Sequence, residues 1–194
     1  MSAAARIRNV RSGALQAQTA VAIEILLMTA IRIRNLATLD LDQNIIFPVS
    51  GKALYLVVEP EAVKNREPLE FPLPEESIEL LEHYLREFRS RLAPRVTTAL
   101  FPGKGGRPKT TRTLRKQISD TVHCYTGLRM HPHVFRHAVA KLYLDANPGA
   151  YEMVRRVLGH KSIDTTIGYY TGLETASAVR HLDKTILGLR RTGP

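Results

Sequence analysis

Cysteine is almost absent from this chain of 194 residues, and long apolar segments are lacking as well. The one cysteine, Cys124, cannot form a disulfide within the chain, which excludes disulfide-stabilised secreted domains and fits a reducing compartment. The most apolar stretch, residues 20–30, is interrupted by Glu24 and is too short to span a bilayer. The first residues lack the apolar run of a signal peptide. We therefore expect a cytoplasmic protein with no membrane partner.

Acidic residues are scarce in the second half of the chain. Residues 1–100 contain 12 Lys or Arg and 12 Asp or Glu, whereas residues 101–194 contain 16 and 6. The whole net charge of +10 therefore belongs to the second half. A one-sided basic field is typical of a face that binds a polyanion, most often nucleic acid. Solubility alone is the alternative interpretation.

The patterns predict a mainly α-helical fold with a small antiparallel β-sheet, an α+β class. Helices are expected over residues 16–31, 75–92, 111–125, 133–146, 148–158, 162–170 and 175–190. Strands are expected over residues 44–47, 53–58 and 69–73, with a hairpin tip at 64–67. Pro72 restricts the last strand to a sheet edge. Asn147 and Ser162 are the expected N-caps of two late helices, and Gly159 is the expected stop between them.

A cluster of cationic side chains is expected on one face of the helix over residues 133–146. At roughly 100° per residue, the members of this stripe are His133, Arg136, His137 and Ala140. The members of the opposite, buried stripe are Phe135, Ala138, Val139, Leu142 and Ala146. Cations crowded together repel unless an anion lies among them, and a phosphate is such an anion. Zinc is the competing ligand, but the chain has no HExxH motif and Arg136 is a poor neighbour for a metal cation.

A third histidine and two tyrosines follow in the next segment. Gly159 is expected to stop a helix, so that His160 lies at a tight turn. Tyr169 and Tyr170 come nine and ten residues later. A free tyrosine has a pKa of about 10, so a nucleophilic tyrosine needs cationic neighbours. Adjacent helical positions point in different directions, so only one of the two phenols can face a given site.

These segments together resemble the C-terminal motifs of the tyrosine recombinases, the phage integrase family. The resemblance is carried by His133-x-x-Arg136, then Leu158-Gly159-His160, then Tyr169 nine residues later. Two upstream segments agree with it. Residues 27–32, Leu-Met-Thr-Ala-Ile-Arg, are similar to the box around the family's first catalytic arginine, and Lys64 before Phe71-Pro72-Leu73 is similar to its β-hairpin lysine. The resemblance therefore assigns these two roles to Arg32 and Lys64.

The resemblance covers nearly the whole chain, and we expect residues 1–194 to form a tyrosine recombinase catalytic domain. The N-terminal helical domain with which the family usually clamps the other face of DNA is expected to be absent. Two positions depart from the family's pattern. The family usually has glycine where Ala30 stands and often has an acidic residue where Asn35 stands.

The resemblance implies a site-specific recombinase that cleaves and rejoins DNA in strand exchange of the integration or excision type. Tyr169 would attack a scissile phosphate, form a 3′-phosphotyrosyl link and release a 5′-hydroxyl. A new 5′-hydroxyl would then reverse the step on another strand. Arg32 and Arg136 would clamp the non-bridging oxygens, to which His160 would donate a further hydrogen bond. Integration, excision, dimer resolution and transposition all remain open.

Proton transfer would fall to two further residues. His133 would act as general acid and base near Tyr169, because imidazole titrates close to neutral pH, and Lys64 would protonate the leaving 5′-oxygen. The cationic side chains would do what metal ions do in other phosphoryl-transfer enzymes. We therefore expect no metal and no cofactor.

The expected partner is double-stranded DNA, which makes a nucleoid-associated location the natural one. The resemblance also implies a homo-oligomer on DNA, held through the C-terminal helix over residues 175–190. A type IB topoisomerase shares the catalytic set and is the alternative within the same chemistry. A non-catalytic DNA-binding module is disfavoured by the complete set, and a metal-dependent nuclease by the missing Asp/Glu cluster.

Overall fold

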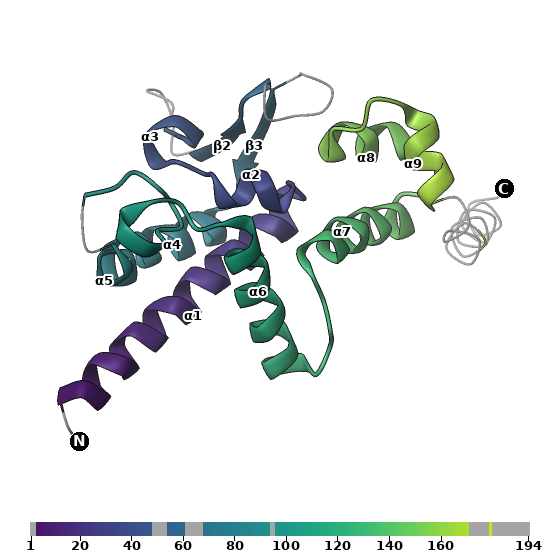
Figure 1. Cartoon of the computed structure of the whole chain (residues 1–194). Coiled ribbons are helices and arrows are strands. Elements are labelled where there is room, and N and C mark those ends of the chain that lie inside the picture. Colours follow the sequence, from purple (N-terminus) through teal and green to yellow (C-terminus); the bar gives the residue numbers. More distant parts are fainter. Residues whose placement is uncertain (1–2, 48–53, 61–67, 94–95, 171–178, 180–194) are drawn as a thin grey trace, which may run out of the picture. The chain divides into compact units, whose positions relative to one another are not determined.

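The computed structural model describes residues 3–47, 54–60, 68–93, 96–170 and 179 of the chain, apart from the side chains of residues 3–9 and 169. The chain divides into two compact units, Met1–Arg136 and His137–Pro194 (Figure 1). None of the helices in the described residues is both long enough and apolar enough to cross a membrane.

The first unit is built around a long helix, α1 (Ala3–Thr29), which lies between the α4–α5 segment and α6 (Figure 1). Its buried side recurs at helical spacing through Ala14, Gln18, Val21, Ala22, Ile25 and Leu26. The helix begins well before the predicted residue 16, because the alanine-rich start has high helix propensity without an apolar pattern. Two short helices follow, α2 (Ile33–Ala37) and α3 (Leu41–Asn44).

A three-stranded antiparallel sheet of order β1-β2-β3 comes next along the chain. Its strands are β1 (Ile45–Ile46), β2 (Leu54–Val58) and β3 (Leu69–Leu73). The edge position predicted for the last strand is confirmed, with Pro72 opposite Tyr55 in the ladder. The hairpin tip predicted at residues 64–67 lies outside the described residues.

The helix predicted over residues 75–92 is confirmed in extent, but its middle is a π-helix. The segment consists of α4 (Glu75–His83), the π-helix η2 (Tyr84–Arg89) and α5 (Ser90–Leu92). Tyr84 in the π-helix is buried, donates to the Leu100 carbonyl at 3.1 Å and accepts from Gln18 Nε2 at 3.1 Å. These two bonds tie the π-helix to α1 and to the chain that follows it.

Helix α6 (Thr111–Thr126) completes the core of the first unit after a short 3₁₀ turn, η3 (Lys104–Gly106). Thr110 caps α6 by accepting from the Thr113 N–H at 3.2 Å, and Gly127 ends it in the left-handed conformation. Lys109 Nζ donates to the side-chain oxygens of Gln18 on α1 and Gln117 on α6. Cys124 lies exposed in the last turn of α6.

Helix α7 (Pro132–Ala146) matches its predicted range, but the predicted buried stripe is confirmed only at Phe135, which is 5% exposed. Leu142, expected inside, is 67% exposed, whereas Arg136 is only 5% exposed and Ala140 is buried. The buried positions Arg136, Ala140 and Leu144 recur every four residues, one position away from the predicted stripe. The apolar pattern missed this stripe because its first member is an arginine that hydrogen-bonds to backbone.

The second unit contains two short helices, α8 (Tyr151–Leu158) and α9 (Ile163–Tyr170). Asn147 is not the cap of α8, because residues 147–149 form a turn in which Gly149 has φ +86°, and the helix begins only at Tyr151. The left-handed stop at Gly159 is confirmed. The cap at Ser162 is confirmed as well, since its Oγ accepts from the Asp164 N–H at 3.0 Å. The helix predicted over residues 175–190 lies outside the described residues, except for residue 179.

Candidate functional site

Arg32 lies in the turn that joins α1 to α2. It is the N-cap residue of α2, with extended backbone angles of φ −72° and ψ 145°. Burial lowers the pKa of the Arg32 guanidinium from its ordinary value, because desolvation disfavours a charge. An arginine remains protonated at physiological pH despite such a shift. A partly desolvated cation interacts more strongly with an anion than a fully hydrated one does.

Two residues earlier, Ala30 has a backbone conformation that is rare for an L-amino acid. Its φ is +49°, in the left-handed region that favours glycine. Glycine adopts such a φ without strain, which explains why the family that the sequence resembles usually has glycine at this position. The carbonyl oxygen of Ala30 accepts a hydrogen bond from Arg136 Nη1. The first unit thus brings Arg136 onto the same turn that carries Arg32, 104 positions earlier in the chain.

His133 lies one helical turn before Arg136 on α7 and is exposed. Its imidazole stacks on that of His131, with ring centroids 6.4 Å apart and an interplanar angle of 13°. Both arginines and His133, all predicted site residues, therefore belong to the first unit. Lys64, also predicted for the site, lies outside the described residues.

In the second unit, His160 is fixed through its backbone and through its ring. The His160 N–H donates to the Arg155 carbonyl at 3.0 Å, and Arg155 Nη1 donates to the His160 carbonyl at 3.0 Å. Its imidazole Nδ1 lies 2.9 Å from Thr166 Oγ1 on α9. Sequence reasoning missed Thr166, because a threonine that follows another threonine in a short helix carries no signal by itself.

Arg155 is held by a carboxylate one turn before it. Its Nε and Nη2 donate to the two oxygens of Glu152, both at 2.7 Å, and Arg156 Nε donates to the same carboxylate at 3.1 Å. The hydrogen bonds from Arg155 and Arg156 lower the pKa of Glu152 to about 2. This bidentate contact orients the guanidinium that holds the His160 carbonyl.

The two adjacent tyrosines end α9. Tyr170 is 2% exposed, and its phenol oxygen lies 2.9 Å from His137 Nδ1. The two rings are tilted by 53° with centroids 5.8 Å apart. The Tyr170 phenol is therefore used in packing the second unit. The backbone of Tyr169 belongs to α9, and its side chain lies outside the described residues.

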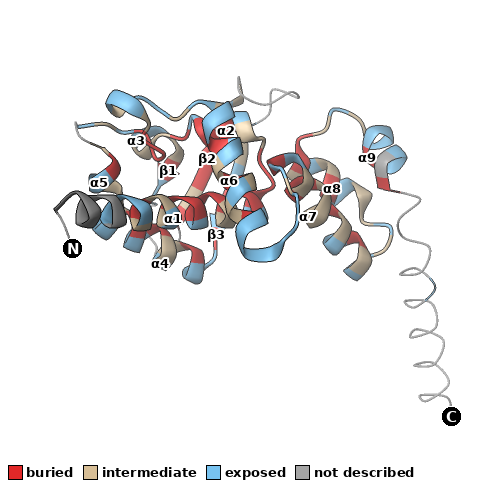
Figure 2. Ribbon diagram, turned by 60° about the horizontal axis from the view of Figure 1, so that its bottom comes forward, coloured by how far each residue is buried: buried red, intermediate tan, exposed pale blue. Residues whose placement is uncertain are grey.

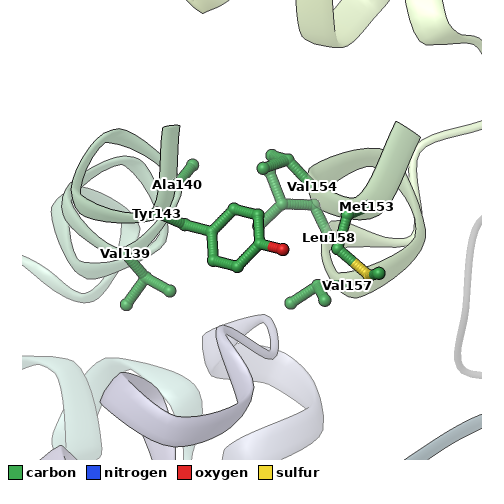
Figure 3. Close-up of a pocket in the computed structure, with 7 residues that line it drawn as sticks. All are labelled: Val139, Ala140, Tyr143, Met153, Val154, Val157 and Leu158. Carbon is green, nitrogen blue, oxygen red and sulfur yellow. The ribbon is translucent and has the colours of Figure 1, made fainter. Parts of the chain in front are cut away.

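A cavity of about 60 Å³ lies between α7 and α8 in the second unit (Figure 3). Its lining comprises Val139, Ala140, Tyr143, Met153, Val154, Val157 and Leu158. The ring of Tyr143 extends from α7 toward the side chains of α8 (Figure 3). No predicted site residue lines it. Among the described residues, no group of three or more His, Cys, Asp or Glu side chains could hold a metal ion.

A model of the phage integrase family matches residues 3–176. The chain belongs to the phage integrase family. It is 39% identical over 98 residues to tyrosine recombinase XerD of Pseudomonas aeruginosa, an alignment that covers 49% of this chain and 32% of the relative. It is 28% identical over 152 residues to tyrosine recombinase XerC of Azotobacter vinelandii, covering 78% of this chain and 47% of the relative. The chain thus spans from about a third to about half of the curated relatives it matches.

Solved structures of this family have the same fold. XerH recombinase bound to its difH substrate before cleavage has a TM-score of 0.63 at 24% identity, over 86% of this chain and 43% of that one. XerA recombinase has a TM-score of 0.64 at 22% identity, and the match covers 95% of this chain and 62% of that one. The predicted resemblance to the tyrosine recombinases and the predicted α+β fold class are both confirmed.

Proposed function

We propose that this chain is the catalytic domain of a site-specific DNA recombinase that cleaves and rejoins strands through a 3′-phosphotyrosyl intermediate. The observation that carries the proposal is the hydrogen bond from Arg136 to the Ala30 carbonyl. It joins two segments far apart in sequence, each of which bears one of the two arginines of the family motif. Two guanidinium groups on one turn form a site suited to the oxygens of a phosphodiester.

In the proposed reaction, the Tyr169 oxygen attacks the scissile phosphorus, and the bond from phosphorus to the 5′-oxygen breaks. The electron pair of the broken bond leaves with the 5′-oxygen, which Lys64 protonates. His133 takes the phenol proton as general base. Attack by another 5′-hydroxyl on the phosphotyrosyl bond reverses each of these transfers and joins a new pair of strands.

Charge on the non-bridging oxygens grows as the phenol attacks. Arg32 and Arg136 would clamp these oxygens with their forked donors, and His160 would donate a third hydrogen bond. The partial burial of Arg32 and the near-complete burial of Arg136 support this role, since desolvated donors stabilise developing charge more strongly.

The proposed partner is double-stranded DNA, bound by a homo-oligomer. The excess of cationic residues after residue 100 supports binding to a polyanion. Among the solved relatives, XerH is bound to difH substrate and λ integrase is a dimer bound to a core site. We extend both properties to this chain and propose that residues 175–190 link its copies.

The test is covalent capture on nicked suicide duplexes that carry candidate sites from the host genome. The expected product is a protein–DNA adduct that survives denaturation. Tyr169→Phe should abolish the adduct and leave DNA binding intact, while Tyr170→Phe, the matched control, should retain the adduct. Loss of the adduct in Tyr170→Phe with retention in Tyr169→Phe would assign the nucleophile to the neighbouring phenol. A wild-type chain that binds these duplexes without forming any adduct would overturn the proposal.

A further inference from the structure

Helix α9 has one narrow buried face. Among its described side chains, Thr166 is 0% exposed and Tyr170 is 2% exposed, whereas the others are exposed (Figure 2). The two buried residues lie four positions apart, so they occupy the same face on successive turns. Both carry a hydroxyl, which a buried position tolerates only when it is hydrogen-bonded.

Each of these hydroxyls contacts a histidine ring. Thr166 Oγ1 lies 2.9 Å from His160 Nδ1, and the Tyr170 phenol oxygen lies 2.9 Å from His137 Nδ1. In both pairs the contact is made at Nδ1 and not at Nε2. The Thr166 contact is the informative one, because His160 is a proposed donor to the phosphate.

A neutral imidazole has one nitrogen that donates and one that accepts. Whichever nitrogen receives a hydrogen bond from a neighbour cannot carry the proton, so the neighbour selects the tautomer. A threonine hydroxyl can donate to Nδ1 and thereby keep the proton on Nε2. If the hydroxyl instead accepted from Nδ1–H, the bare Nε2 lone pair would repel a phosphate oxygen.

We propose that Thr166 is the positioning residue that sets the tautomer of His160. Its hydroxyl donates to Nδ1, so the neutral ring donates from Nε2 to a non-bridging oxygen without needing a charge. This inference rests on the proposed function, which makes His160 a donor to the scissile phosphate.

The role of Thr166 is separable from the fold of the His160 loop. Arg155 holds the backbone of His160 through two hydrogen bonds of 3.0 Å, and Gly159 supplies the left-handed turn before it. Removing the Thr166 hydroxyl should therefore leave the loop in place and free only the rotation and tautomer of the ring.

The first experiment measures the tautomer directly in the full chain without DNA. Long-range ¹H–¹⁵N correlation of the histidine rings should report His160 with its proton on Nε2 in the wild type. Thr166→Val, which keeps the shape and removes the hydroxyl, should shift the His160 resonances toward a mixture of tautomers. Thr166→Ser should retain the wild-type pattern.

Thr165→Val, at the exposed neighbouring position, is the matched control and should change nothing. A wild-type His160 with its proton on Nδ1, or an unchanged pattern in Thr166→Val, would overturn the inference.

The second experiment measures the rate of adduct formation at saturating DNA. Thr166→Val should react about 10- to 100-fold more slowly, by analogy with the loss on removing the hydrogen-bond partner of a metal-ligating histidine. Its DNA affinity should stay unchanged, and Thr166→Ser should restore the rate. If Thr166→Val reacts at the wild-type rate, or if Thr166→Ser is as slow as Thr166→Val, the positioning role is wrong while the proposed function stands. If the wild type forms no adduct, the proposed function fails, and the positioning role fails with it.

Discussion

Ala30 shows how a single residue can hold an unfavourable conformation for the benefit of a site. It is the one non-glycine residue among those described that has a positive φ. The left-handed region costs an L-residue roughly 1–2 kcal/mol. Here that conformation ends α1 and directs the Ala30 carbonyl to Arg136. The strain persists because surrounding contacts fix the turn: Ala30 is 0% exposed, and its carbonyl accepts the hydrogen bond from Arg136.

Replacing Ala30 by glycine should therefore stabilise the chain. Ala30→Gly removes the clash of the β carbon and should raise the free energy of unfolding by about 1 kcal/mol, measured by urea denaturation. The reverse change at the end of α6 is the control. Gly127 has φ +72°, and a β carbon at this position would meet no other atom within 4 Å. Gly127→Ala should therefore lose about 1 kcal/mol from backbone strain alone. A loss of stability in Ala30→Gly would show that the turn carries no strain.

Several elements of the first unit meet at one half-buried lysine. Lys109 follows the turn of η3 and donates to Gln18 on α1 and to Gln117 on α6. Gln117 Nε2 in turn donates to Thr19 Oγ1 at 2.7 Å. Burial, and to a smaller extent the nearby charge of Arg11, lowers the pKa of the Lys109 amine to about 8. The network thus contains a cation that is easier to deprotonate than an exposed lysine.

This shift predicts a rise of stability at alkaline pH. Between about pH 8 and the ordinary lysine value of 10.5, the unfolded chain binds more protons at this position than the folded chain does. The contribution of Lys109 to the free energy of unfolding is therefore complete at pH values above its pKa in the unfolded chain. It is lost as the pH falls through its pKa in the folded chain. Relative to Lys109→Met, the wild type should gain about 1–2 kcal/mol of unfolding free energy from pH ~8 to pH ~10. Lys116→Met, at an exposed lysine of α6, is the control and should show no such difference from the wild type. If the pH profile of Lys109→Met runs parallel to that of the wild type, the proposed pKa shift of Lys109 is wrong.

Which elements could be predicted depended on how locally each is determined. Helices α6 and α7 were located because their helical patterns lie within their own residues, although the apolar period of α7 predicted mostly the wrong buried face. The start of α8 was missed because Asn147 and Pro148 fit a turn as well as a helix cap. The π-helix and the left-handed Ala30 depend on packing partners far along the chain, to which no local pattern points.

The features of the candidate site also fall into two groups: residues that local motifs indicate, and contacts that form only when the chain folds. Arg32, His133, Arg136 and His160 are predicted as site residues from the order and spacing of the motifs in the sequence. The bond between Arg136 and the Ala30 carbonyl, and the contact of Thr166 with the His160 ring, arise only on folding. Every residue has a backbone carbonyl, so residue types could not show that the Ala30 carbonyl accepts a hydrogen bond from an arginine.

At the scale of the whole molecule, the uneven charge predicts a strong salt dependence of DNA binding. Each phosphate neutralised releases counterions and adds about 0.9 to the slope of log K against log salt. Arg115→Ala, at an exposed position on α6, should lower this slope by about one, measured by fluorescence anisotropy over a salt series. Arg86→Ala removes an arginine paired with Glu87 in the neutral first half and should leave the slope unchanged. Equal slopes for both variants would remove α6 from the DNA-binding face.

The proposed chemistry uses cationic side chains where many phosphoryl-transfer enzymes use metal ions. Adduct formation by the wild type should therefore proceed at the same rate in EDTA as in Mg²⁺, measured on the nicked duplexes. The control is a restriction enzyme that requires Mg²⁺, digesting the same DNA in the same buffers. A rate that falls in EDTA and recovers when Mg²⁺ is restored would show that a metal ion, and not the side chains alone, supplies the positive charge for the reaction.

The solitary thiol of Cys124 offers a direct way to count subunits. It is exposed at the end of α6, and every copy of the chain has only this one. A maleimide dye would therefore attach once per protomer without any cysteine having to be engineered away. Photobleaching steps on single immobilised duplexes would then count how many copies of the chain bind each duplex.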